Sequence, residues 1–522
     1  MLEFINQEAN ITTTENGAAT YASTNSYCLD LFATIGALRN SYEDEIVSRF
    51  IRAYAENADL AMKILFFARD IRGGLGERRV FRVILSWLAE NEPYSVRQNL
   101  AYIAEYGRYD DYLVLMDTAC EREMLDLLKA QFDNDFANLD KHGEVSLLAK
   151  WLPSVNTSSK DTVYLAKRVA RAFGMNDASY RKALSALRAQ IHIIENNLRT
   201  RDYTFDYEKQ PSRAMFKYKQ AFIRNDQERY MTFLNNVLQG KATLHADNVA
   251  PYELIRPYVM CNSAFELINP IVEEEKVTLN TLWTALPDFC GDEDMLAVID
   301  TSGSMYWRGG LPAAVALSLG LYLAEHNKGR FRNHFVTFSD HPHFVRLKGK
   351  TFADKLQYAL TFCEGWGTDL EAVFELILRA AVMNKLPQKE LPGKLVIISD
   401  MEFNVCVTNA SETNFENARR RYEAYGYKLP EIVFWNVGSR NRQQPVTMNE
   451  QGVALVSGVT PRLFSMIAGN DLSPYKLMME TLGSHSDRYG GFQSVPAGSI
   501  CVPFDTRLLS ALHSRHFCEH TS

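Results

Sequence analysis

The sequence has eight cysteines, none of them in a C-x-x-C pair. Structural zinc sites usually take their thiolate ligands from such closely spaced pairs, so we expect no zinc site. The first twenty residues contain no basic region followed by an apolar run, from which we expect no signal peptide. Scattered cysteines in a chain without a secretion signal favour a cytoplasmic protein with reduced thiols.

Long apolar runs and nucleotide motifs are also missing. No stretch of about 18 uncharged apolar residues occurs, so we expect no membrane-spanning helix. The GKT triplet at 349–351 has Phe344 where a phosphate-binding loop requires glycine, which argues against a nucleotide cofactor. No G-x-S-x-G motif occurs, and no general base stands out. These absences predict a binding protein rather than an enzyme.

The formal net charge is −7, but acidic and basic residues are unevenly distributed along the chain. Residues 1–149 hold 14 Lys and Arg against 24 Asp and Glu, whereas residues 150–224 hold 15 against 6. A basic stretch of this kind can form a surface for an anionic partner. The alternative, that these side chains are the solvated faces of ordinary helices, stays open at this point.

With 522 residues the chain is too long for one hydrophobic core, and its pattern divides it. Residues 1–27 are polar and predict an irregular arm. Residues 28–289 show apolar stripes at spacings of three and four, as in Ile46, Phe50, Ile51 and Tyr54. Many short helices in succession indicate an all-α solenoid or ring, although no repeated signature proves a regular repeat.

Residues 290–510 predict an α/β domain with a doubly wound, mostly parallel sheet. Compact apolar runs alternate with helical segments, the arrangement of strands that are buried on both faces. The expected strands are 295–300, 334–339, 394–400, 431–437 and 453–458. VTFSDHPHFVRL at 336–347 predicts a hairpin that adds an antiparallel edge strand. Residues 511–522 are expected to be a loose tail.

Three loops at the carboxyl ends of these strands carry oxygen ligands, where open α/β sheets bind their ligands. The residues are Asp300, Ser302, Ser304, Thr368 and Asp400. Two carboxylates and three hydroxyls form a hard ligand set that suits Mg²⁺ best, with Mn²⁺ or Ca²⁺ as alternatives. Glu402 is expected beside these ligands or at the surface. Each of these loops alone is weak evidence for a metal site, because D-x-S-x-S occurs by chance and Thr is a common helix N-cap.

The order D-x-S-G-S, then Thr, then Asp resembles the metal-ion-dependent adhesion site of von Willebrand factor type A domains. The resemblance implies that the metal's open position takes a carboxylate from a protein partner, without hydrolysis.

Several segments of the helical half are more particular than generic helices. They are FFARDIRGGLGERRVFR (66–82), EYGRYDDYL (105–113), LLAKWLPSVNT (147–157), YRKALSALR (180–188) and PSRAMFKY (211–218). They resemble the helical module of the TROVE family, the Ro autoantigen proteins, and also a related group of unassigned function with the same domain order. The Ro resemblance implies a ring of HEAT-like helices that binds small non-coding RNA as a ribonucleoprotein.

Carried over to this chain, the resemblance puts the RNA surface on the basic segment. Its residues are Lys150, Lys167, Arg168, Arg171, Arg181, Lys182 and Arg188, with Trp151, Tyr164 and Tyr180 placed to stack on unpaired bases. Two alternatives remain. The charges of residues 69–79 can form a buried ion-pair network that fixes a helix turn, and the whole protein can be a metal-dependent adaptor without nucleic acid.

Overall fold

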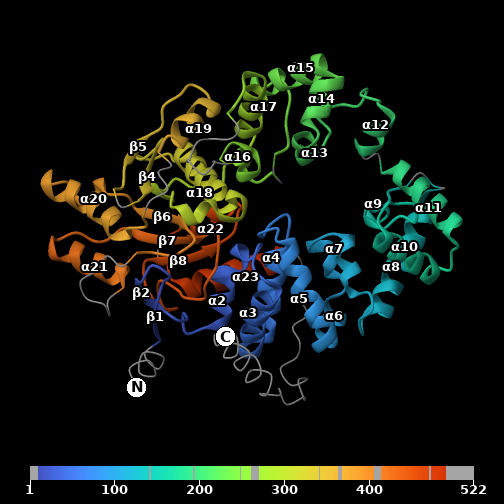
Figure 1. Cartoon of the computed structure of the whole chain (residues 1–522), viewed down its shortest axis with the longest axis horizontal. Coiled ribbons are helices and arrows are strands. Elements are labelled where there is room, and N and C mark those ends of the chain that lie inside the picture. The colour runs from blue at the N-terminus through green and yellow to red at the C-terminus, as the bar shows by residue number, and fades with distance from the viewer. Residues whose placement is uncertain are drawn as a thin grey trace, which may run out of the picture.

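The computed structural model describes residues 10–139, 141, 143–191, 194–246, 249–259, 270–339, 341–362, 367–404, 413–469 and 472–488. The predicted loose tail at 511–522 lies outside the described residues. Helices fill most of the first half, and a six-stranded sheet with flanking helices follows (Figure 1). The predicted order, a helical part and then an α/β part, is confirmed.

The sheet has the strand order β5-β4-β3-β6-β7-β8. Its strands are β3 (Met295–Asp300), β4 (His334–Phe338), β5 (Phe344–Arg346), β6 (Lys394–Ser399), β7 (Glu431–Asn436) and β8 (Val453–Ser457). All neighbours are parallel except β4 and β5, which form the predicted antiparallel hairpin. Every residue of β3 and β6 is buried, which explains why these strands appear in the sequence as unbroken apolar runs.

Helices cover both faces of the sheet. On one face α18 (Trp307–His326) packs along β3, and Ala297 and Ile299 share its core. The other face carries α20 (Leu370–Met383) and α21 (Asn414–Ala424), which enclose Leu296 and Val298 in a second core. The remaining helices of this part are α19 (Phe352–Leu360), α22 (Leu463–Ile467) and α23 (Pro474–Arg488).

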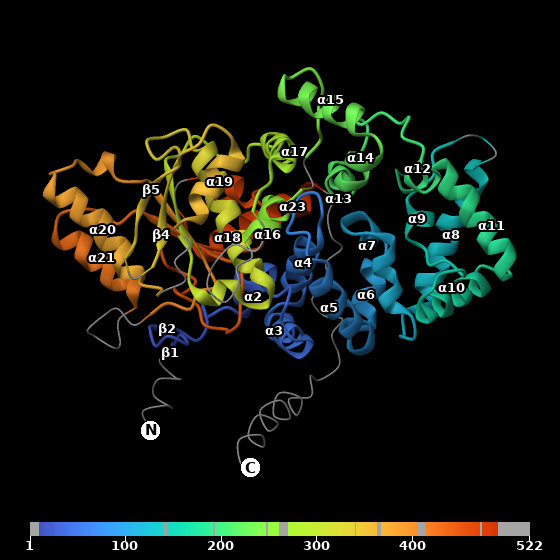
Figure 2. The same cartoon turned by 45° about the horizontal axis from the view of Figure 1, so that its top comes forward.

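The helical part follows an arch that starts and ends on the α/β part (Figures 1 and 2). At the start, α2 (Tyr27–Thr34) packs against β8, and at the end α16 (Pro251–Val259) packs along α18. Between them lie α3 (Glu43–Glu56), α4 (Ala58–Arg69), α5 (Arg78–Asn91), α6 (Pro93–Asn99), α7 (Tyr102–Tyr106), α8 (Glu121–Leu139), α9 (Leu148–Trp151), α10 (Lys160–Ala172), α11 (Asp177–Gln190), α12 (Ile194–Thr200), α13 (Ser212–Lys217), α14 (Lys219–Asn225) and α15 (Gln227–Leu238). Helix α17 (Glu273–Thr284) follows α16 and contacts α19.

Part of the arm that was predicted to be irregular is a small hairpin, so that prediction is wrong for residues 11–21. Strands β1 (Ile11–Thr13) and β2 (Ala19–Tyr21) pair antiparallel. The turn between them is closed by the amide of Ala18, which donates to the Thr14 hydroxyl at 3.0 Å. Ala18 is buried in the core with α20 and α21, so tertiary contacts rather than a long apolar run stabilise this hairpin.

The charged run at residues 69–79 contributes to an ion-pair network of which Arg69, Asp70 and Glu77 are buried, whereas Arg72, Arg78 and Arg79 are exposed, so the prediction of a buried network is confirmed in part. The Arg69 guanidinium lies 2.7 Å from Asp111, and both side chains are buried. Glu77, fully buried, pairs with Arg39 at 2.6 Å. The turn also needs Gly74, because a Cβ atom there would lie 1.9 Å from the carbonyl oxygen of Phe67. This network fixes the connection between α4 and α5.

Among the described residues, Cys28, Cys120 and Cys290 carry free thiols. A search of the described helices found none with the length and apolar character that crossing a bilayer requires.

Candidate metal centre

Asp300 and Asp400 lie side by side at the carboxyl end of the sheet. Asp300 is the last residue of β3 and Asp400 follows β6, and these parallel neighbours pair Ile299 with Ile398. The Ser399 hydroxyl donates to Oδ2 of Asp300 at 2.5 Å. Both aspartates are almost completely buried, with exposed fractions of 1% and 3%. Two carboxylates are therefore held out of water next to each other.

Burial disfavours the ionised form of both carboxyl groups. Burial, with the negative charge of Asp400 added, raises the pKa of Asp300 to about 7. Burial also raises the pKa of Asp400, while the positive charge of Arg440 opposes that change. A cation placed between two such carboxylates would remove their repulsion and replace part of their lost hydration.

Hydroxyl groups surround this pair. The turn after β3 brings the Ser302 and Ser304 hydroxyls to 3.0 Å from each other, and the amide of Ser302 donates to Asp300 at 2.9 Å. The Ser304 side chain is hydrogen bonded to Asp400. Thus four of the five predicted ligands form one connected group.

The fifth predicted ligand, Thr368, is buried and hydrogen bonded to a neighbouring loop. Its hydroxyl lies 2.8 Å from the side-chain oxygen of Asn404 and 3.0 Å from the carbonyl oxygen of Glu402. It also accepts a hydrogen bond of 3.3 Å from Asn16. Thr368 is therefore part of the hydrogen-bond network of this edge, and its hydroxyl oxygen keeps one lone pair that can bind an ion.

The donor set fits a hard divalent cation. Two further hydroxyls at the same strand ends, those of Thr301 and Ser339, are buried and lack a hydrogen-bond partner within the described part of the chain. The described residues contain no group of three or more His, Cys, Asp or Glu side chains that could hold a metal. An ion here would thus depend on two carboxylates, several hydroxyls and water, which is the preference of Mg²⁺.

Three further residues lie beside the site. Arg440 and Glu15 were not predicted from the sequence, and Glu402 was expected either beside the ligands or at the surface. Arg440, after β7, lies 3.0 Å from Asp400 and 2.9 Å from Glu15 of the hairpin turn. Glu402 is buried rather than at the surface, and its carboxylate accepts hydrogen bonds from the amide of Glu15 (2.8 Å) and from Asn441 (2.9 Å). Burial raises the pKa of Glu402. Arg440 was detectable as a charged residue after a strand, but nothing in the sequence links Glu15 to this edge.

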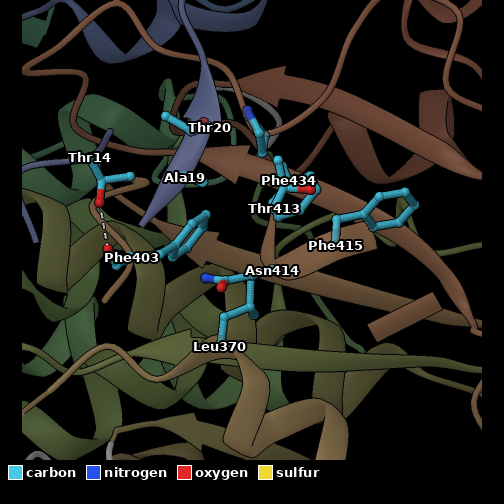
Figure 3. A pocket seen from close by; sticks show the side chains of 10 residues that line it. Thr14, Ala19, Thr20, Leu370, Phe403, Thr413, Asn414, Phe415 and Phe434 are labelled. Carbon is cyan, nitrogen blue, oxygen red and sulfur yellow. Dashed lines mark hydrogen bonds between the residues drawn. The ribbon is translucent and has the colours of Figure 1, made fainter. Parts of the chain in front are cut away.

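A small hollow lies between the hairpin and α21 (Figure 3). Phe403, Phe415 and Phe434 contribute to its lining, and the Thr14 hydroxyl donates to the carbonyl oxygen of Phe403 at 2.6 Å. Its walls are mainly apolar, so it supports the hairpin rather than offering ligands to an ion.

The basic residues predicted as an RNA surface differ from one another in their surroundings: some are paired with acidic side chains and others are exposed. Arg168 pairs with Asp117 and Glu121 at 2.5 Å each, and Lys167 lies 3.7 Å from Asp177. The Nζ atom of Lys150 lies 5.5 Å from the Trp151 ring. Of the predicted RNA-surface residues on α10 and α11, Arg171, Arg181 and Lys182 are exposed and make no ion pair within the described ranges.

Two side chains of the predicted surface, Arg188 and Tyr180, make contacts that stabilise the helical part. Arg188 donates to the carbonyl oxygens of Ala149 and Leu152, each at 2.8 Å, and to the Ser154 hydroxyl at 2.7 Å. Tyr180 is completely buried, and its hydroxyl donates to Pro153, so the expectation that it stacks on bases is wrong. Tyr164 remains 58% exposed.

The fold and the site define a two-part protein, in which a helical arch is joined to an α/β domain with an acidic, hydroxyl-rich centre at its strand ends. Residues 14–130 and 122–289 match the family described as "Domain of unknown function (DUF2828)", and residues 294–476 match "Domain of unknown function (DUF7788)". The first model covers more than half of the chain, which therefore belongs to the DUF2828 family.

One relative is the "Uncharacterized protein L728" of Acanthamoeba polyphaga mimivirus. It is 27% identical over 516 residues, which cover 91% of this chain and 87% of the relative. Among solved structures, the Deinococcus radiodurans RO (RSR) protein is similar with a TM-score of 0.32 and 14% identity, over 88% of this chain and 93% of that one. Membership of the Ro family stays a prediction.

Proposed function

We propose that this protein binds a partner through a divalent cation held by its α/β part, which is of the von Willebrand factor type A kind. The ion, most suitably Mg²⁺, is held by Asp300, Ser302, Ser304, Thr368 and Asp400. The observation that carries the proposal is the burial of Asp300 beside Asp400 at adjacent strand ends. When bound, the ion supplies an attraction for an anionic oxygen, so the partner's contact group is a carboxylate.

The two buried aspartates favour a role in cation binding over a purely structural role, because together they destabilise the metal-free fold. Two adjacent buried carboxylates are unfavourable unless a cation or a proton neutralises them. The Arg440 guanidinium reaches Asp400, whereas the hydrogen-bond partners of Asp300 are Ser399 and Ser302. A site that keeps this repulsion in its metal-free state is suited to a cation that binds reversibly.

The test is a calorimetric titration of the metal-free, full-length protein with Mg²⁺ and Mn²⁺. We expect one ion per chain, and we expect Asp300→Asn to abolish binding. The same substitution should raise the thermal midpoint of the metal-free protein, because it removes one of two repelling charges. Asp44→Asn, which removes an exposed carboxylate on α3, is the matched control. Stoichiometric binding retained by Asp300→Asn would refute the assignment.

RNA binding is a second candidate function, and one observation favours it. Arg171, Arg181 and Lys182 are exposed on α10 and α11, within the segment whose basic residues outnumber acidic ones 15 to 6. Several unpaired cations on neighbouring helices suit a phosphate backbone. The pairing of Arg168 with Asp117 and Glu121 reduces the area available, so the surface is smaller than the sequence predicted.

A titration with a structured RNA that carries a single-stranded tail tests this candidate. Affinity should fall steeply with salt, and reversing Arg171, Arg181 and Lys182 to Glu should lower the log–log slope by about 2, at roughly 0.7 per single-strand phosphate contact. Reversal of Arg379, Lys385 and Lys389, exposed on and after α20, is the control with an equal change of charge. An absence of RNA binding at low salt would leave the metal-dependent adaptor as the function.

A further inference from the structure

The loop of residues 439–443, which follows β7, places a positive charge at the candidate metal centre. Nη2 of Arg440 donates to Oδ2 of Asp400 at 3.0 Å. Nη1 of the same guanidinium lies 2.9 Å from Oε2 of Glu15, in the turn of the N-terminal hairpin. The side chain of Asp400 is 3% exposed and that of Glu15 is 45% exposed. One guanidinium therefore bridges a buried carboxylate and a carboxylate that reaches solvent.

Contacts outside the centre hold this loop in place. The Arg49 guanidinium, on α3, donates to the hydroxyl of Ser439 and to the carbonyl oxygen of Asn441, each at 2.8 Å. In return, Nε of Arg442 donates to Glu45 of α3 at 2.9 Å. The backbone of the loop is thus fixed by the helical part, so the fold keeps the bridging guanidinium at the centre.

Four carboxyl groups lie at this edge of the sheet, those of Asp300, Asp400, Glu402 and Glu15. Within the described ranges, the cationic side chain in ion-pair contact with these groups is that of Arg440, which reaches Asp400 and Glu15. Glu402 accepts hydrogen bonds from three neutral donors instead. The positive charge of the metal-free centre is therefore concentrated on Asp400, the residue that the proposed ion also needs.

A guanidinium and a divalent ion exclude each other at Asp400. Its Oδ2 atom accepts from Arg440, while its Oδ1 atom lies 3.4 Å from the amide of Glu402. An ion that binds Asp300 and Asp400 together carries the same sign of charge as the guanidinium and requires the same carboxylate. Because like charges repel strongly at such short range in a buried site, the ion must take the place of the guanidinium.

Glu15 provides the guanidinium with a second partner on the solvent side. The Arg440 side chain is 31% exposed, so it has room to move away from Asp400. Its ion pair with Glu15 does not depend on Asp400, because a different nitrogen atom makes it. Leaving Asp400 therefore costs Arg440 one of its two ion pairs and keeps the other.

We propose that Arg440 is an autoinhibitory counter-ion of this metal centre, and this proposal rests on the proposed function. Without a divalent ion the guanidinium neutralises Asp400. A divalent ion binds by displacing the guanidinium towards Glu15, and the strength of the contact between Arg440 and Asp400 sets the ion concentration at which the centre fills.

The experiment measures two quantities on the full-length protein: Mn²⁺ affinity, by electron paramagnetic resonance of free Mn²⁺, and the thermal midpoint of the metal-free form. Arg440→Gln should strengthen Mn²⁺ binding roughly fivefold or more, because an occupant that must leave first lowers the apparent affinity. It should also lower the metal-free midpoint, because Asp400 loses its partner. Arg379→Gln, an equal change of charge at an exposed position of α20, should change neither quantity.

The opposite signs of these two effects separate inhibition from a structural role. A merely structural arginine would lower both quantities when replaced, so Mn²⁺ affinity at or below the wild-type value in Arg440→Gln would overturn the proposal. Arg440→Lys keeps the charge and should bind Mn²⁺ more weakly than Arg440→Gln; equal affinities would overturn the proposal too. In either case, loss of Mn²⁺ binding in Asp300→Asn would leave the metal centre standing. A wild-type protein that binds no Mn²⁺ overturns both proposals.

Discussion

Nε2 of His485, on the last described helix α23, lies 2.9 Å from Oδ2 of Asp70, the C-cap residue of α4. Both side chains are buried, and 415 positions separate them in the sequence. Asp70 also accepts hydrogen bonds from the amides of Arg72 (2.8 Å) and Gly73 (3.0 Å). One carboxylate thus shapes the α4–α5 turn and fastens the last described helix to it.

Replacing His485 should loosen this attachment. His485→Ala removes the contact with Asp70 and the packing of the ring on Phe67 and Tyr106, whose centroids lie 5.4 and 5.2 Å away. We expect a loss of about 2–3 kcal/mol from the first unfolding transition in urea. Ser484→Ala, on the exposed side of the same helix, should change it little. Equal effects of the two substitutions would contradict a special role of the histidine.

Gly74 should not tolerate any side chain. A Cβ atom would lie 1.9 Å from a backbone oxygen, so Gly74→Ala forces the α4–α5 turn to move and disrupts the ion pairs around it. We expect a loss of more than about 3 kcal/mol. Gly483 in α23 has nothing within 4 Å of such an atom, so Gly483→Ala should stabilise by about 0.5–1 kcal/mol. Thermal denaturation of both variants checks the contrast.

The metal-free protein should lose stability as the pH rises from about 4 to about 7. The pKa of Asp300 is about 7 in the folded state against 3.8 for the free side chain. Over this window the folded state binds more protons than the unfolded state, so rising pH favours unfolding. We expect Asp300→Asn to flatten this dependence, measured as thermal midpoint against pH. A wild-type curve that rises over the same window would be inconsistent with the buried pair.

The same pair predicts how metal binding depends on pH. A proton and a divalent ion compete for Asp300, so Mn²⁺ affinity should fall below about pH 7. Calorimetry at several pH values, in buffers of different ionisation enthalpy, should detect protons released on binding near neutral pH. If binding released no protons there, the ion would not be displacing one from Asp300.

Arg188 and Arg181 should respond differently to truncation. Arg188→Ala leaves the carbonyl oxygens of Ala149 and Leu152 without their donor, so we expect a loss of about 1–3 kcal/mol. Arg181 is exposed on the same helix, and Arg181→Ala should stay within about 0.5 kcal/mol. Urea denaturation separates the two, and a neutral Arg188→Ala would remove it from the fold and return it to the proposed RNA surface.

The sheet and the aspartate pair could be predicted from the sequence because both depend on local patterns. Strands buried on both faces appear as apolar runs, and residues after neighbouring parallel strands meet at one edge. The contact of Glu15 with Arg440 could not be predicted, because it joins segments about 425 positions apart and short strands with no apolar pattern.

The burial of Tyr180 has a signal in the sequence. Tyr180, Ala183, Leu184 and Leu187 follow one another at spacings of three, one and three, which places them on one face of a helix. All four are buried in α11. The apolar stripe thus indicates a core position for the tyrosine, whereas the stacking prediction rested on its aromatic character alone.

Because the helical arch is attached to the α/β part through α2 on β8 and through α16 on α18, its width is set by the sheet domain. Both ends of the arch are thus attached to one domain. A force on the middle of the arch is carried by both attachments, and breaking one attachment leaves the other in place. The separation of β8 from α18 therefore sets the distance between the two ends of the arch.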